Sequence, residues 1–110
     1  MTRNPITEPL SPDLVERGNV LKAHVYEADL ISLSYLYLSP GAKIKTHLHI
    51  TENEIYLLET GNQCTCSVNN KIYVLKNGEN SVCLVGQQHD LENTSEHDIK
   101  VLSIKYQPTF

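Results

Sequence analysis

Two histidines separated by one residue, His47 and His49, form the pattern in this sequence that most directly suggests chemistry. In a β-strand, side chains two positions apart point to the same face, so both imidazoles can reach one metal ion. Glu54 follows after a short connection. If its strand pairs with the histidine strand, its carboxylate can turn back toward the same point. Two imidazoles and one carboxylate form a facial ligand set that suits divalent ions with open coordination positions.

A third imidazole, His89, lies well downstream, after Gly86 and at the expected start of another strand. A barrel would be able to bring it beside the first three residues. A pair of alternating histidines is common in proteins that bind no metal, so this pair alone does not decide between a metal site and ordinary histidines. The spacing of the surrounding glycines carries more information.

That wider spacing resembles the two sequence motifs of the cupin superfamily. The first motif is matched at every signature position by Gly41-(five)-His47-x-His49-(four)-Glu54-(six)-Gly61. The second is matched by Gly78-(five)-Leu84-x-Gly86-(two)-His89-(three)-Asn93, except that Leu84 stands where the family usually has proline. The resemblance extends over residues 30–106, which is most of the chain.

The resemblance implies an all-β fold, the double-stranded β-helix or jelly-roll barrel, and a divalent metal ion. The ion would be Fe, Mn, Ni or Zn, since all four accept these ligands. The ligands carried over from the motifs are His47, His49, Glu54 and His89. Cupins with this ligand set include dioxygenases, isomerases, decarboxylases and lyases that act on sugars and small organic acids. The alternative is a non-catalytic cupin module or sensor that binds metal or a small ligand, and fold alone does not choose between them.

The elements that must position these residues are short strands separated by turns, spaced as in a β-sandwich or barrel. Residues 43–49 and 54–58 are expected strands, and residues 64–68 pair with 71–75 across a two-residue Asn69-Asn70 turn. Residues 30–38 alternate, yet neither face is wholly polar, which predicts a strand covered on both sides. Residues 1–18 are expected to form an N-terminal arm, and residues 19–110 a single barrel domain.

Three further residues are expected near the metal. If no bulge intervenes, strand alternation places Lys45 on the same face as the two histidines. There it either binds an anionic substrate or lies at the rim of the barrel with its ammonium group in solvent. Tyr56 shares the face of Glu54 and is either a proton donor or a wall residue with a satisfied hydroxyl. Gln87 precedes His89 by two residues, so alternation predicts that its side chain also points into the metal-binding pocket. The catalytic role stays open between Lys45 and Tyr56.

The three cysteines are Cys64, Cys66 and Cys83, an odd number that fits reduced thiols better than a disulfide framework. Cys64 and Cys66 share a strand face. They form either a soft-metal or redox pair or, as we expect, two small core residues.

The chain has 110 residues, a net charge of −4 and a pI of about 5.7, with its lysines and arginines scattered. These values predict one domain and exclude the basic stripe that a nucleic-acid interface needs. The sequence has no apolar run of about 20 residues, so we expect no membrane partner and a cytoplasmic location. The expected partners are a small-molecule ligand and a second copy of the chain, because small cupins often form homodimers by sheet packing and exchange of N-terminal segments.

Overall fold

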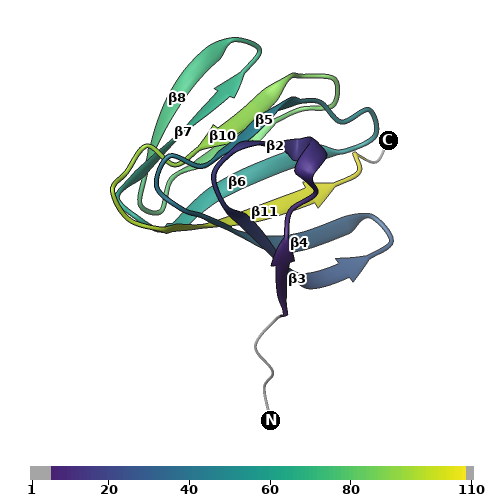
Figure 1. Cartoon of the computed structure of the whole chain (residues 1–110). Coiled ribbons are helices and arrows are strands. Elements are labelled where there is room, and N and C mark those ends of the chain that lie inside the picture. The colour runs from purple at the N-terminus through teal and green to yellow at the C-terminus, as the bar shows by residue number, and fades with distance from the viewer. Residues whose placement is uncertain (1–5, 109–110) are drawn as a thin grey trace.

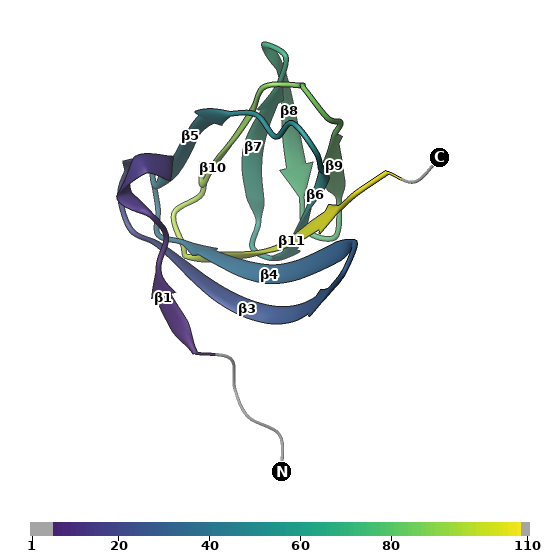
Figure 2. The ribbon, with the colours of Figure 1, turned by 90° about the vertical axis from the view of Figure 1, so that its right-hand side faces the viewer.

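Eleven strands and one short 3-10 helix make up the computed structural model, which describes residues 6–108. One antiparallel sheet contains, in spatial order, β1 (Thr7–Pro9), β3 (Val20–Ala28), β4 (Ile31–Leu38), β11 (Ile99–Tyr106), β6 (Asn53–Thr60) and β9 (Asn80–Cys83). The other contains β2 (Val15–Arg17), β5 (Lys43–His47), β10 (His89–Glu92), β7 (Gln63–Val68) and β8 (Lys71–Lys76). The two sheets form separate layers in Figure 1 and enclose a common interior in Figure 2. The predicted all-β jelly roll is confirmed.

The core lies between the two sheets and follows the strand alternation. On β4, Ser34, Leu36 and Leu38 point inward and are buried, whereas Tyr35 and Tyr37 point outward and are half-buried. Residues of β11 that pair with the inward residues of β4 are also inward, since Val101 pairs with Leu36 and is fully buried. In the single chain the outer face of this strand is therefore covered only in part, although its sequence is as apolar as that of a strand buried on both sides.

The hairpin predicted at Asn69-Asn70 is confirmed. Both residues adopt left-handed backbone angles, with φ of 48° at Asn69 and 69° at Asn70. Asparagine tolerates this region better than most residues, and two such residues in succession form the tight turn whose twist matches antiparallel strands. The turn fixes the register of β7 against β8.

The described part of the expected N-terminal arm contributes one short element to each sheet. Residues 7–9 form β1, which pairs with β3, and residues 15–17 form β2, which pairs with β5. Between them lies the 3-10 helix η1 (Pro12–Leu14), which begins with a proline as short helices often do. Residues 1–5 of the expected arm lie outside the described residues. Within the described range, no helix has the length and apolar composition needed to cross a membrane.

Candidate metal centre

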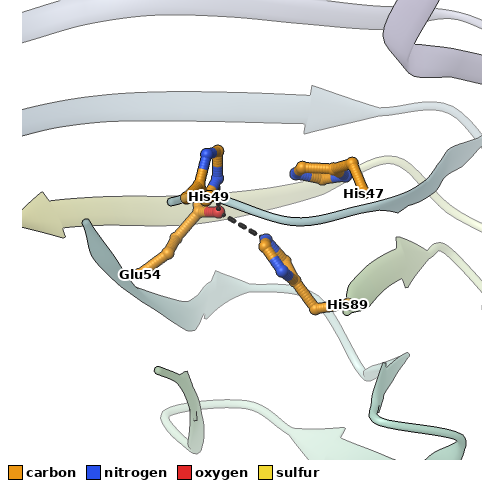
Figure 3. Close-up of side chains that lie close together, drawn as sticks. All are labelled: His47, His49, Glu54 and His89. Atoms are coloured by element: carbon orange, nitrogen blue, oxygen red, sulfur yellow. Dashed lines mark hydrogen bonds and ion pairs between the residues drawn. The ribbon is translucent and has the colours of Figure 1, made fainter. Parts of the chain in front are cut away.

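Four side chains that could ligate a metal meet at one end of the barrel interior: His47, His49, Glu54 and His89. Each offers one ligand atom, and these atoms all lie within 4.8 Å of one another. Figure 3 shows His49 and His89 directed at the carboxylate of Glu54, with His47 beside them. The grouping implied by the two motifs is therefore present in the fold.

The elements that deliver these side chains differ in part from the prediction. Glu54 could turn toward the histidines if its strand, β6, paired with theirs, but β6 and β5 belong to opposite sheets, so the cluster bridges the interior between them. His47 is the last residue of β5, and His49 lies in the connection beyond it instead of in the strand. His89 opens β10 as expected and is paired directly with His47 across the ladder.

Hydrogen bonds outside the cluster orient two of the imidazoles. Nδ1 of His47 lies 2.8 Å from the carbonyl oxygen of Lys45. A carbonyl can only accept, so this nitrogen carries the proton and Nε2 keeps its lone pair for a ligand bond. Nδ1 of His89 lies 3.0 Å from the thiol sulfur of Cys83, and its Nε2 also faces the cluster. Partners of this kind commonly fix the orientation of metal-binding histidines.

Glu54 is the centre of the cluster's hydrogen bonding. Its Oε1 accepts from Nε2 of His89 at 2.7 Å and from Nε2 of His49 at 3.0 Å, and its Oε2 accepts from the hydroxyl of Ser103. Burial raises the pKa of Glu54, but these hydrogen bonds, together with the charge of Lys105, outweigh burial and hold that pKa well below its usual range. The residue is therefore a buried carboxylate at neutral pH.

The imidazole of His47 is uncharged at neutral pH. Burial is the largest influence on its pKa and lowers it, and the neighbouring His89 acts in the same direction. Metal ligands must be deprotonated, so a neutral imidazole beside an ionised carboxylate has the protonation state that binding requires.

The donor set fits a divalent transition metal. Ligand bonds of about 2.0–2.2 Å place opposite ligand atoms about 4.2 Å apart. The observed span of 4.8 Å needs side-chain shifts of only a few tenths of an ångström. Three imidazole nitrogens and one carboxylate oxygen suit Fe, Mn, Ni or Zn. The ion itself is not fixed by these residues.

A cavity opens from the cluster into the barrel. The empty space within it, including open solvent at its mouth, is about 430 Å³. His47 and Glu54 form its metal end, and the walls are Leu10, Leu14, Lys22, Ser32, Ser34, Leu36, Ile44, Tyr56, Ser103 and Lys105. An ion held by the four ligands would therefore be approached from this side.

Of the other predicted site residues, Tyr56 lines the cavity, whereas Lys45 and Gln87 do not. Tyr56 is buried and lines the cavity beside Glu54. Lys45 is exposed and does not line the cavity, because the register of β5 against β10 shifts between Ile44 and His47 and breaks the alternation. Gln87 also lies outside the cavity wall, where its side-chain oxygen accepts a hydrogen bond from the Leu84 backbone at 2.8 Å and braces the loop before His89.

The apolar wall residues were not predicted as site residues, and neither were five polar ones: Lys22, Ser32, Ser34, Ser103 and Lys105. Ser103 and Lys105 alternate with outward residues on β11, and the ladder pairs Lys105 with Glu54. The strand over residues 99–106 was predicted, and alternation along it places Ser103 and Lys105 on the same face. The sequence did not show that this strand lies beside the Glu54 strand, nor which residues of the two are paired.

All three cysteines are buried and free. Cys64 and Cys66 pack in the core between the sheets, and burial raises the pKa of the Cys64 thiol to about 12. Cys83 lies behind the metal cluster, where its thiol contacts the carbonyl of Gln87 as well as the ring of His89.

Comparisons with known proteins agree with this architecture. The family model described as "Cupin domain" matches residues 34–105. A predicted oxalate decarboxylase from Thermotoga maritima superposes with a TM-score of 0.86 at 24% identity over 94% of both chains. KdgF from a Halomonas species gives 0.80 at 14% identity, over 94% of this chain and 87% of that one. A cupin-superfamily sugar phosphate isomerase from Silicibacter pomeroyi gives a TM-score of 0.70 at 13% identity, over 81% of this chain and 60% of that one. No curated protein gives a significant match.

Proposed function

The chain belongs to the cupin family, and from this premise we propose that it is a metal-dependent enzyme acting on a small, oxygen-rich molecule such as an organic acid or a sugar. The observation that carries the proposal is the convergence of three imidazoles and one carboxylate at the end of a cavity lined by polar and apolar side chains. Structural neighbours named as a predicted oxalate decarboxylase and a sugar phosphate isomerase support the same substrate classes.

The residues would divide the work as follows. His47, His49, Glu54 and His89 hold the ion, and four ligands leave positions free for substrate oxygens. When bound, the ion supplies Lewis acidity at those positions. The chain's own contribution is to present Glu54 as a carboxylate and His47 as a neutral imidazole, to orient the ligands and to surround the substrate with the cavity walls.

Tyr56 is the cavity residue best suited to donate a proton or a hydrogen bond to a substrate. It is buried beside Glu54, and burial, followed by the negative charge of Glu54, raises the pKa of its hydroxyl well above the usual value. The hydroxyl therefore keeps its proton at neutral pH. Its ring also packs 5.7 Å from the ring of His89, centroid to centroid, which holds it close to the metal end.

Metal content and turnover test the proposal together. The protein purified without added metal should contain close to one divalent ion per chain, and His49→Ala should lose it. His97→Ala is the matched control, because His97 is an exposed histidine outside the cluster. Turnover of keto acids, uronates, sugars and phenols, with and without oxygen, then identifies the reaction. Stoichiometric metal in His49→Ala would contradict the site, and a metal-loaded protein that turns over none of these would favour the binding module.

We further propose that the chain forms a homodimer through the outer face of the six-stranded sheet. Across β4, β11 and β6 this face is apolar and half-buried, with Leu33, Ile104 and Ile55 in one cross-strand row. A contiguous apolar surface of this kind is typical of a protein interface. Ile104→Asp should halve the mass measured by light scattering. Ile72→Asp, on the exposed β8 of the other sheet, should not change it.

Exchange of the N-terminal segment is a separate part of the dimer proposal. β1 is joined to β3 through only three residue pairs, so the same strand could add to the β3 edge of a second copy. Deletion of residues 1–12 should then weaken the dimer. An unchanged mass after the deletion would contradict a role for the segment.

A further inference from the structure

Two lysines that no motif contains reach the cavity of the proposed metal centre. Lys105 lies on β11 directly between Glu54 on β6 and Ser32 on β4, so it is the next inward-facing residue beyond the carboxylate ligand. Lys22 lies on β3, paired with Leu36, and lines the same cavity farther from the metal ligands. Positive charge therefore extends from the metal end across the cavity wall.

The charge balance of the cavity is positive before any metal binds. Lys22, Lys105 and Glu54 are its lining residues that carry charge at neutral pH. Within residues 6–108, the ion pairs of the structure engage neither Lys22 nor Lys105, whereas Lys43 and Lys100 each have a carboxylate partner. A bound divalent ion would more than neutralise Glu54. A ligand that brings two negative groups would match this distribution.

Hydroxyl groups accompany the two ammonium groups. Ser32 and Ser34 line the cavity on β4, between the strands that carry the lysines. Serine hydroxyls and ammonium groups are both donors, and donors of this kind hold the oxygens of a carboxylate or phosphate. The wall that extends from Glu54 across β11 and β4 to β3 therefore offers donors suited to an anionic group.

We propose that Lys22 and Lys105 form an anion subsite, so that the substrate of the proposed metal centre is a small acid with two ends. One end carries the oxygens that bind the metal, and the other carries a carboxylate or phosphate group held between the two lysines. Only the metal-binding end of this ligand depends on the proposed function. Lys22 lies outside the residues matched by the family model, Lys105 is the last of them, and neither lysine is a signature residue of the two motifs.

Binding of three matched α-hydroxy acids tests the subsite. Glycerate, malate and 3-phosphoglycerate share one metal-binding end and differ in the second group, which is a neutral hydroxyl, a carboxylate or a phosphate. Calorimetry on the zinc-loaded protein should show malate or 3-phosphoglycerate binding at least about tenfold more tightly than glycerate. The tighter of the two assigns the second group as carboxylate or phosphate.

Variants connect that preference to the lysines. Lys22→Met and Lys105→Met should each bring the affinity for the preferred acid, malate or 3-phosphoglycerate, to within about threefold of that for glycerate, with zinc content unchanged. Lys105→Arg should retain the preference because it keeps the charge. Lys71→Met is the control, since Lys71 is exposed on β8, away from the cavity.

Two results would overturn the subsite. One is glycerate binding as tightly as both malate and 3-phosphoglycerate to the parent protein. The other is an undiminished preference in fully zinc-loaded Lys22→Met and Lys105→Met. If instead the parent protein takes up no metal, the proposed function fails, and the same titrations on the metal-free protein decide the subsite separately. A preference for malate or 3-phosphoglycerate that depends on the lysines supports the subsite there too.

Discussion

Ser103 supports the metal centre without binding the ion, and its removal gives a quantitative test of the site. Its side chain is only 4% exposed, and its hydroxyl donates to Oε2 of Glu54, the oxygen that the histidines do not use. Ser103→Ala removes this donor and adds no bulk. We therefore expect two separate losses, one in the stability of the metal-free protein and one in metal affinity.

The magnitudes follow from the burial of the carboxylate. Glu54 is 3% exposed, so water does not readily replace the lost donor, and the metal-free protein should lose about 1–3 kcal/mol of unfolding free energy. Removal of a group that orients a metal ligand typically weakens metal affinity about 10- to 100-fold. This corresponds to about 1.4–2.7 kcal/mol of binding free energy.

Urea unfolding of the metal-free protein measures the first loss, and competition with a chromogenic chelator for Zn²⁺ measures the second. Ser32→Ala is the control, because Ser32 also lines the cavity but donates no hydrogen bond to Glu54 in the structure. Zinc affinity of Ser103→Ala within threefold of the parent value would refute the reasoning. It would mean that the orientation of Glu54 does not matter to the ion.

Other predictions address the fold and the metal. Gly61→Ala should destabilise the protein by more than about 2 kcal/mol, because φ is +143° and a Cβ would lie 2.6 Å from Cγ2 of Ile99. Gly78→Ala is the comparison, since φ is +86° there and the space around it is open. It should cost about 1 kcal/mol in the same thermal unfolding assay. The free energy of unfolding should fall between pH 9 and 12, because an ordinary thiol has a pKa of 9.0 and the folded Cys64 one of about 12, so the unfolded chain loses its proton first. Urea midpoints at pH 8 and 10.5 that coincide would contradict this. EDTA should lower the melting temperature of the metal-loaded protein and added metal should restore it, whereas equal melting temperatures would argue against a bound ion.

The metal cluster was predictable because its residues are fixed by short-range spacing. His47, His49 and Glu54 lie within eight positions, and His89 was assigned through the resemblance to the second cupin motif, which sets its distance from Gly86. The fold class was predictable for a related reason, since turns such as Asn69-Asn70 are encoded by the residues that form them. Which strands are neighbours was not encoded locally, and the pairing of the Glu54 strand, which the sequence left open, proved to lie in the sheet opposite the histidine strand.

The cavity walls depended on information that no single segment contains. A one-residue register change on β5 moves Lys45 to the exterior, and such irregularities leave no clear mark in the sequence. Lys105 enters the cavity because β11 lies beside β6, although the two strands are separated by almost forty residues. Long-range register of this kind is set by the packing of the whole sheet.

Leu10 and Leu14 bear on how this protein could acquire new specificities. They form part of the cavity wall, yet they belong to the first elements of the chain and lie outside the residues matched by the family model. The segment that carries them joins the sheets only at their edges, through β1 and β2. Substitutions there can reshape the ligand space while the strands that hold the metal ligands keep their sequence. Evolution can thus vary this part of the cavity wall while the four candidate ligands are preserved.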